Sequence, residues 1–355
     1  MEMKEEFHIE TDLAADVASL SKFLRDEYPE GDIADERFLQ WEYLDNPFGK
    51  AFISSARNMN HVLATQYAII PFEVVIKGKT VRASLSLNTL TAKEFRGKGL
   101  FVRTAESNYS YCAENGVVFT VGIPNANSFP GFTKKLNFKH CGNLNFLVRP
   151  LRPLNILRSF IKSSKIKKGN ELSIIMDKDS LAKQGVSFFD PFADRPLYEP
   201  FWHEWKRQTK IILNRTPEYL SWRYLQNPLR KYQLLKISKN EEMKAVAIFR
   251  TLNIYGLRTC VLMDFFCTDN IYGRDLLNAI EQEMNAKGMD IMMVASAKMS
   301  GTFALLKNAG FMKVPEFLLP QQLPFILKVH REFENSEVIA DMKSWHFTFG
   351  DYDIF

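Results

Sequence analysis

The residues best suited to chemistry lie in a glycine-containing turn between a predicted strand and a predicted helix. Residues 85–91 alternate apolar and polar side chains, a pattern typical of a β-strand. The turn at residues 96–99 reads Arg-Gly-Lys-Gly, and residues 101–112 then repeat apolar or small side chains at helical spacing. Glycine lets a backbone approach a ligand closely, and the first N–H groups of a helix attract anions. The stretch therefore predicts a phosphate-binding site.

Length and composition indicate the setting of this site. The chain has 355 residues, of which 46% are hydrophobic, and this is enough for two sizeable cores. The net charge of +5 suits an anionic ligand but is too small to indicate nucleic-acid binding. No apolar run reaches the roughly 18 residues of a membrane helix, and the charged first residues do not resemble a signal peptide. We expect a cytoplasmic protein without a nucleic-acid partner or an integral membrane segment.

The cysteines and histidines give no sign of a metal site. The four cysteines lie far apart or inside apolar runs, as expected of reduced core thiols, and no Cys/His spacing suits zinc. We therefore expect no metal cofactor.

An internal repeat indicates how the predicted site is held. Residues 39–50 match residues 220–231 at an offset of 181 positions (222 − 41 = 181). Seven of the twelve aligned positions are identical: Leu39/Leu220, Trp41/Trp222, Tyr43/Tyr224, Leu44/Leu225, Asn46/Asn227, Pro47/Pro228 and Lys50/Lys231. Weaker matches extend the repeat in both directions. The sequence therefore predicts a duplicated mixed α/β unit of roughly 150 residues.

The repeat divides the chain into four parts. We expect an N-terminal domain at 1–150, a basic linker at 151–184, a C-terminal domain at 185–330 and a docked aromatic tail at 331–355. Residues 149–170 hold seven Lys or Arg and no acidic residue, with leucines at helical spacing. This segment fits a connector helix packed on a domain, a basic wall for an anionic substrate, or a helix on a membrane surface.

Three motifs, in order along the chain, resemble the GNAT superfamily of N-acyltransferases. Residues 89–101 are similar to the family's fourth strand and pyrophosphate loop, and residues 119–128 to its fifth strand and the helix start that follows. Residues 131–138 are similar to the family's "FYEKLGF" ending. With the repeat, the resemblance implies an α/β fold (α+β mixed sheet) of two tandem GNAT-like domains. Residues 270–275 replace the phosphate loop without its two glycines, so the second domain is degenerate and should bind no CoA.

The resemblance implies acetyl-CoA or another acyl-CoA as the cofactor. In the family the loop's backbone N–H groups hold the pyrophosphate, and the fourth strand pairs with the pantetheine arm while one N–H polarises the thioester carbonyl. The expected cofactor-binding residues are Leu90, Thr91, Arg96, Gly97, Lys98, Gly99, Leu100, Phe101 and Asn127.

The catalytic groups are poorly indicated. Thr133 stands where the family usually has a Tyr that protonates the thiolate, and a Thr hydroxyl is a poor proton donor. Weak candidates for the general base are Glu73, His140 and the Phe355 carboxylate. A solvated hairpin carboxylate explains Glu73 more simply, and a strand histidine explains His140. Phe355 counts only if the tail folds into the cleft, as in some tandem-GNAT aminoglycoside acetyltransferases.

These patterns predict an acyl-CoA-dependent N-acyltransferase, active in its first half. The acceptor would be a small-molecule or sugar-like amine, and similar tandem proteins occur in bacterial surface-polysaccharide systems. Two alternatives stay open: a catalytically inactive CoA-binding scaffold, and Fem-type aminoacyl transfer to cell-wall peptide, against which the intact 96–99 turn argues. The identity of the acceptor, the acyl chain and the oligomeric state are not indicated.

Overall fold

The computed structural model describes residues 6–12, 16–162, 170–297, 301–319 and 321–352. The chain forms two compact units. Unit 1 comprises 1–142, 226–229 and 323–340, and unit 2 comprises 143–225, 230–322 and 341–355. We describe each unit by itself.

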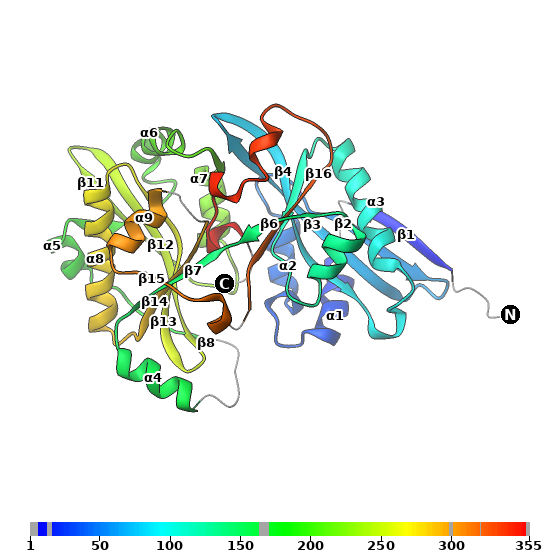
Figure 1. The fold of residues 1–355 in the computed structure, drawn as a ribbon, viewed down its shortest axis with the longest axis horizontal. Helices are drawn as coiled ribbons and strands as arrows, with labels where there is room; N and C mark the ends of the chain where they lie inside the picture. Colours follow the sequence, from blue (N-terminus) through cyan, green and yellow to red (C-terminus); the bar gives the residue numbers. More distant parts are fainter. Residues whose placement is uncertain (1–5, 13–15, 163–169, 298–300, 320, 353–355) are drawn as a thin grey trace. The chain divides into compact units, whose positions relative to one another are not determined.

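Unit 1 is built on a mixed sheet (Figure 1). In spatial order its strands are β1 (Phe7–Asp12), β2 (Phe52–Asn58), β3 (Leu63–Ile76), β4 (Lys79–Thr91), β5 (Phe119–Gly122), β16 (Pro324–Val329) and β6 (Lys139–Asn143). β1 to β4 are antiparallel, β5 is parallel to β4, and β16 is antiparallel to β5.

Helices cover this sheet. They are α1 (Val17–Glu27), η1 (Asp32–Ala34), α2 (Glu36–Tyr43), η2 (Lys93–Phe95), α3 (Leu100–Glu114), the π-helix η3 (Gly131–Lys135) and η6 (Ser336–Val338). The apolar stripe of α3 is buried against β2 and β3: Ala105, Tyr109 and Cys112 share a core with Phe52 and Tyr67. The predicted helix after the glycine turn therefore forms because its apolar face has a sheet to cover.

Unit 2 repeats the same plan. Its sheet runs in the order β15 (Met312–Lys313), β7 (Asn145–Pro150), β14 (Ile291–Ser296), β13 (Leu257–Cys267), β12 (Glu242–Ile254), β11 (Gln233–Lys239) and β9 (Val186–Phe188), with β8 (Asn170–Glu171) on β12. β10 (Ile211–Leu213) pairs with β17 (Trp345–His346). The helix α8 (Asn270–Ala286) buries Leu276, Ile280 and Met284 against this sheet. The expected mixed α/β fold is therefore confirmed.

The remaining helices of unit 2 are mostly short. They are α4 (Pro153–Lys162), α5 (Lys178–Lys183), α6 (Arg195–Lys206), α7 (Pro217–Leu220), the π-helix η4 (Ser221–Leu225), α8 (Asn270–Ala286), α9 (Gly301–Asn308), η5 (Glu316–Leu318), η7 (Met342–Ser344) and η8 (Phe349–Asp351). On α4, in the basic linker, Leu154 and Leu157 are exposed. No helix in the described ranges has the length and apolar character needed to cross a bilayer.

Each unit contains a strand that comes from the other half of the sequence. β16 lies between β5 and β6 in unit 1, and β7 lies between β14 and β15 in unit 2. The units therefore differ from the contiguous domains expected at 1–150 and 185–330. The free edges of β5 and β14 require antiparallel partners, and either half of the chain can supply one.

The C-terminal tail also divides between the units. Residues 331–340 belong to unit 1, where Lys77 contacts Asn335. Residues 341–352 belong to unit 2 and bury Trp345 and Phe349. The expectation of a single docked segment at 331–355 is thus replaced by two separately packed pieces.

A histidine directly after β16 ties this strand to its neighbours in unit 1. His330 Nε2 lies 2.7 Å from Thr120 Oγ1 on β5, and its ring packs against Tyr109. Burial, reinforced by the charge of Lys328, lowers the pKa of His330 from 6.5 to about 4.

Acid should therefore destabilise unit 1 through His330. The unfolded chain binds a proton near pH 6.5 and the folded chain only near pH 4, so stability falls as pH falls between these values. From pH 7 to pH 5 the loss is up to about 2 kcal/mol. Urea unfolding of His330→Gln should show a correspondingly weaker pH dependence, whereas His61→Gln, at an exposed turn, should behave as wild type. An unchanged pH dependence in His330→Gln would contradict this.

Candidate active site

The β4 strand of unit 1 has an open edge. Its parallel pairing with β5 ends at Leu85 and Val121, yet β4 continues to Thr91 while β5 stops at Gly122. Within the described chain, residues 86–91 pair with a strand only on the β3 side. An open edge of this kind can accept an extended ligand as an added strand.

A bulge interrupts β4 within this open edge. Ala68 of β3 pairs with Leu87, but Gln66, two residues away, pairs with Leu90, so β4 holds one extra residue. Asn88, in the bulge, has φ of 47°, a left-handed conformation that Asn tolerates better than most residues. A bulge turns backbone groups out of the ladder, where a ligand can reach them.

Four hydrogen-bonded residues stabilise the bulge of β4, and we call them the bulge cluster: Glu42, Tyr43, Gln66 and Asn88. Asn88 Nδ2 donates to Glu42 Oε2 at 2.6 Å and to the Tyr43 hydroxyl at 3.1 Å. Gln66 Nε2 donates to the same hydroxyl and to the Asn88 carbonyl, both at 3.1 Å. Glu42, Tyr43 and Gln66 are buried. A carboxylate of α2 is thus brought to the bulge of β4.

The glycine turn lies at the end of this edge and starts α3. Gly97 and Gly99 have φ of 82° and 76°, and Gly99 caps the helix without a side-chain hydrogen bond. A Cβ added at either glycine would meet nothing within 4 Å. Conformation rather than packing therefore requires glycine here, and the space beside the first N–H groups of α3 can hold an anion such as a pyrophosphate.

The basic residues of the turn are partly engaged within unit 1. Arg96 and Lys93 each lie 3.3 Å from a carboxylate oxygen of Glu27. Burial opposes ionisation of Glu27, but its hydrogen bonds and charge interactions with Lys93 and Arg96 outweigh burial and lower its pKa. Lys98 lies over the Phe95 ring at 5.4 Å. The backbone of the turn, more than these side chains, is what remains to bind a phosphate.

The other predicted cofactor residues occupy different settings. Leu90 is buried and its carbonyl accepts from Thr65 Oγ1, which also lies 2.8 Å from Thr91 Oγ1. Asn127 is exposed on the turn after β5. The side chain that organises this turn is Asn125, whose Oδ1 accepts from the Asn127 backbone N–H at 3.0 Å.

The first turn of α3 contacts η3 through aromatic rings. Leu100 is buried in the core, and the Phe101 ring meets the Phe132 ring edge-on at 5.5 Å. A Cβ on Gly131 would lie 3.0 Å from Phe101. Phe101, where the family often has a small residue, therefore packs the start of α3 onto η3.

Glu73 is not brought to the bulge. It pairs with Arg82 across the β3–β4 hairpin, six residues of β4 from Asn88 (88 − 82 = 6). At the rise of a strand this is roughly 20 Å. A base at Glu73 would therefore lie far from a thioester held at the bulge.

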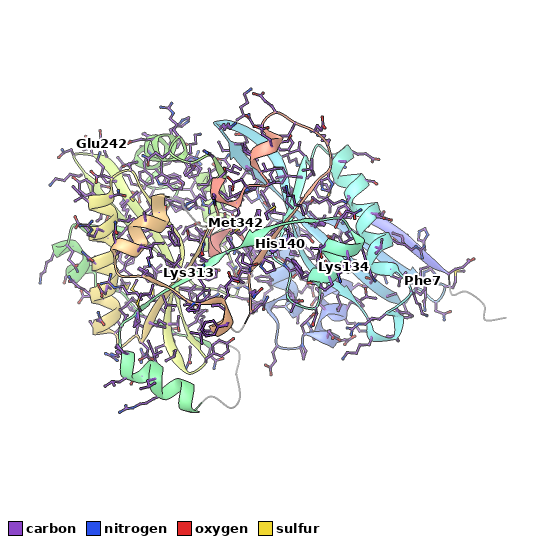
Figure 2. The ribbon with its side chains drawn as sticks, in the orientation of Figure 1. Phe7, Lys134, His140, Glu242, Lys313 and Met342 are labelled. Carbon is purple, nitrogen blue, oxygen red and sulfur yellow. The ribbon has the colours of Figure 1, made fainter. Side chains whose placement is uncertain are left out.

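The other sequence candidates for catalysis are placed as follows. His140 is exposed on β6, with the Phe129 ring edge-on at 5.1 Å (Figure 2). The Thr133 hydroxyl donates to the Phe129 carbonyl at 2.9 Å, a bond internal to its own helical turn. Phe355 lies outside the described residues.

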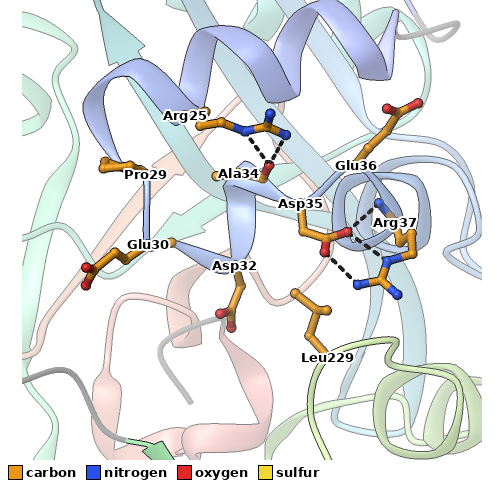
Figure 3. A pocket seen from close by; sticks show the side chains of 10 residues that line it. Arg25, Pro29, Glu30, Asp32, Ala34, Asp35, Glu36, Arg37 and Leu229 are labelled. Carbon is orange, nitrogen blue, oxygen red and sulfur yellow. Dashed lines mark hydrogen bonds and ion pairs between the residues drawn. The ribbon is translucent and has the colours of Figure 1, made fainter.

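A hollow of about 510 Å³ lies beside the start of α2 (Figure 3). Two arginines of its lining are held by hydrogen bonds. Arg37 donates to both carboxylate oxygens of Asp35, at 2.8 and 3.1 Å, and Arg25 donates to the Ala34 carbonyl. The hydrogen bonds from Arg37 lower the pKa of Asp35. α2 thus lines this hollow with its first turn and contributes Glu42 to the bulge cluster from its last.

Unit 2 contains the counterpart of the open edge. β13 pairs with β14 as far as Leu262 and Val294, and its pairing with β12 slips between Leu262 and Asp264. The Tyr224 hydroxyl donates to Asp264 at 2.5 Å, as Tyr43 meets Asn88 in unit 1. The two bulges are therefore equivalent in place and in their tyrosine contact.

In unit 2 the chain's own C-terminal segment, residues 347–352, fills this place. The Ala297 N–H, just after β14, donates to the Phe347 carbonyl at 3.3 Å. Thr348 Oγ1 donates to Asp264 Oδ1 at 2.8 Å at the bulge of β13. The segment thus joins the two strands where they diverge.

Buried charges fix this C-terminal segment. Arg215 Nη2 lies 2.8 Å from Asp264 and 2.6 Å from Asp351, and all three side chains are fully buried. Burial raises the pKa of Asp351 to about 6, although Arg215 acts in the opposite direction. Removing Arg215 would leave two buried carboxylates without their counter-ion, which makes this cluster a strong anchor.

The phosphate loop is also replaced in unit 2. Asp269 caps α8 and its carboxylate accepts from the Ile271 N–H at 2.7 Å. A Cβ on Gly273 would lie 2.7 Å from Cys267 Sγ, so this glycine serves packing. A carboxylate at the helix start repels a phosphate, and unit 2 therefore offers no equivalent anion site.

Residues 20–141 match the sequence model of a family described as an acetyltransferase (GNAT) domain. Residues 20–141 are therefore a GNAT acetyltransferase domain. No curated protein matches the sequence significantly. The matched residues include the bulge cluster, the glycine turn and all of α3, so the GNAT domain is the unit with the open β4 edge.

Solved structures share the fold over nearly the whole chain. A GCN5-related N-acetyltransferase from Anabaena variabilis has a TM-score of 0.63 and 14% identity, covering 91% of this chain and 73% of that one. Saccharomyces cerevisiae N-myristoyltransferase with bound myristoyl-CoA has a TM-score of 0.59 and 13% identity, covering 98% and 85%. A probable N-acyltransferase from Enterococcus faecalis has a TM-score of 0.62 and 10% identity, covering 91% and 73%. At these identities the likeness shows the fold alone.

Among the residues that the structure describes, no group of three or more His, Cys, Asp or Glu could hold a metal ion. The groups at the open edge of unit 1 are the bulge cluster, the backbone of β4 and the start of α3.

The fit of the C-terminal segment in unit 2 can be tested at Gly350. A Cβ there would overlap the Tyr224 hydroxyl and lie 2.6 Å from Asp264 Oδ2. Gly350→Ala should lower the free energy of unfolding of unit 2 by about 2 kcal/mol or more. Gly301→Ala, where the Cβ meets nothing within 4 Å, is the control. Equal melting temperatures for the two variants would show that the segment is not packed as described.

Proposed function

We propose that the protein transfers a short acyl group, most simply acetyl, from acyl-CoA to the amine of a small polar or sugar-like acceptor, and that it does so in the cytoplasm with unit 1 alone. One observation carries this proposal. Unit 1 keeps the β4 edge open beside an uncapped α3, whereas unit 2 fills the equivalent edge and caps the equivalent helix.

Each part of the open edge has a role in binding acyl-CoA. The N–H groups after Gly97 and Gly99 would hold the pyrophosphate with the helix dipole behind them. The pantetheine arm would add as a strand along β4, with Asn127 on its far side. A backbone N–H released by the bulge near Asn88 would then point at the thioester carbonyl and stabilise the charge that develops on its oxygen.

The reaction needs a neutral amine and a proton for the departing thiolate. The amine nitrogen attacks the thioester carbon, the C–N bond forms, the C–S bond breaks, and one N–H proton of the amine ends on sulfur. Thr133 is a poor donor because its hydroxyl already bonds to Phe129. This feature favours a second candidate, a CoA-binding scaffold without turnover.

Acyl-CoA binding can be tested with two glycines of matched geometry. Gly97 and Gly78 have φ of 82° and 84°, and a Cβ at either meets nothing within 4 Å. Gly97→Trp should abolish acetyl-CoA binding in isothermal titration because its ring occupies the phosphate site. Gly78→Trp, in the β3–β4 hairpin, should carry the same backbone strain and bind normally.

Two outcomes would contradict the proposal. Wild-type protein that does not bind acetyl-CoA would exclude it. Equal loss of binding in both tryptophan variants would show that strain, not the phosphate site, is responsible. Binding without thiol release across a panel of amines would instead favour the scaffold.

A further inference from the structure

The internal repeat allows the filled cleft of unit 2 to be used as a template for unit 1. At the offset of 181 residues, Tyr43 corresponds to Tyr224 and Glu42 to Arg223. Both tyrosine hydroxyls contact the side chain at the strand bulge, Asn88 in one unit and Asp264 in the other. The residues before the two tyrosines therefore stand at equivalent positions of the repeat, Glu42 on α2 and Arg223 on η4.

In unit 2 this place faces the occupant of the cleft. Arg223 Nη2 donates to the Tyr352 carbonyl at 2.7 Å, and Arg223 Nε donates to the Gly350 carbonyl at 3.2 Å. Arg223 is buried, so its donors are committed to the C-terminal segment. In unit 2 the side chain before the tyrosine therefore contacts the segment that fills the cleft. Its guanidinium N–H donors match an occupant that presents carbonyl acceptors.

In unit 1 the same position has the opposite chemistry. Glu42 is an acceptor, its side chain is buried, and Asn88 fixes its Oε2 at the bulge. By analogy with Arg223, its carboxylate would face the junction at which an acyl group on β4 would meet an acceptor. A carboxylate at this place matches an occupant that presents N–H donors.

We propose that Glu42 receives the acceptor amine and takes its proton during acyl transfer. This inference rests on the proposed function. It names the amine-facing residue of the same site and assigns Asn88 the task of positioning Glu42.

The proton balance is simple. An N–H of the neutral amine donates to Glu42 as the nitrogen attacks the thioester carbon. The C–N bond forms, the C–S bond breaks, and the proton moves to the Glu42 carboxylate. It is then delivered, directly or through water, to the thiolate of CoA. The products are the amide and the free thiol, and Glu42 returns to its ionised form.

The proton role can be separated from simple support of the bulge. In Glu42→Gln the side-chain carbonyl can still accept from Asn88, so the bulge is kept while the proton acceptor is lost. Turnover of acetyl-CoA with a panel of glucosamine, spermidine and kanamycin should fall about 100-fold to 10 000-fold. The affinity for acetyl-CoA by isothermal titration should stay within about threefold of wild type. Glu114→Gln, an exposed residue at the end of α3, is the control and should retain full activity.

The conservative variant adds a readout that a purely structural role would not give. Glu42→Asp keeps a carboxylate at a shorter reach and should recover part of the turnover that Glu42→Gln loses. It also serves as a check if the Gln variant folds poorly.

Three results would overturn the inference while leaving acyl-CoA binding intact. The first is wild-type turnover in Glu42→Gln. The second is turnover in Glu42→Asp that is no higher than in Glu42→Gln. The third is a protein that binds acetyl-CoA but releases no thiol with any amine of the panel. Failure of wild type to bind acetyl-CoA would instead remove the proposed function itself.

Discussion

The arrangement of both units follows from one constraint: the edge of a β-strand must find a partner for its backbone groups. β4 and β13 each diverge from the parallel strand beside them, and each therefore leaves part of an edge open. On the far side of β5 and β14, strands exchanged between the halves of the sequence complete the pairing. In unit 2 the C-terminal segment occupies the divergence. In unit 1 it is open to an extended ligand, which is the physical basis for placing acyl-CoA there.

The charges at the two bulges show how a duplicated site acquires two uses. In unit 2, Arg215 is fully buried between Asp264 and Asp351, and the two carboxylates depend on it as their counter-ion. Because Asp351 lies in the C-terminal segment, this charge cluster holds the segment in place. In unit 1 the equivalent bulge carries the neutral amide of Asn88 and the carboxylate of Glu42. The Asn88 amide is held by Glu42 and Tyr43 of unit 1 itself, so this bulge does not depend on an occupant of the cleft for these hydrogen bonds.

The sequence was sufficient to predict those parts of the site whose residues are neighbours in the chain. The glycine turn, the strand before it and the helix after it lie next to one another in the chain, and their chemistry is evident from residue type. It was insufficient for the exchange of β7 and β16, because an alternating pattern shows that a strand forms but not which sheet it joins. Glu73 was considered for its place in a hairpin, but only the register shows that it lies roughly 20 Å from the bulge. Glu42 gives no signal in the identities of the repeat, because Arg223 stands at the equivalent position.

The difference at Glu42 and Arg223 is more informative than the identities around it. Trp41 and Trp222 are both buried, and Tyr43 and Tyr224 both support a bulge, so these pairs report what the two folds share. A position that faces the cleft is under a different requirement, since it must match whatever fills that cleft. Where the occupant is a stretch of backbone with carbonyl groups, an arginine can donate hydrogen bonds to those carbonyls. A glutamate in the same place satisfies an N–H donor, and an amine attacking a thioester beside β4 is such a donor.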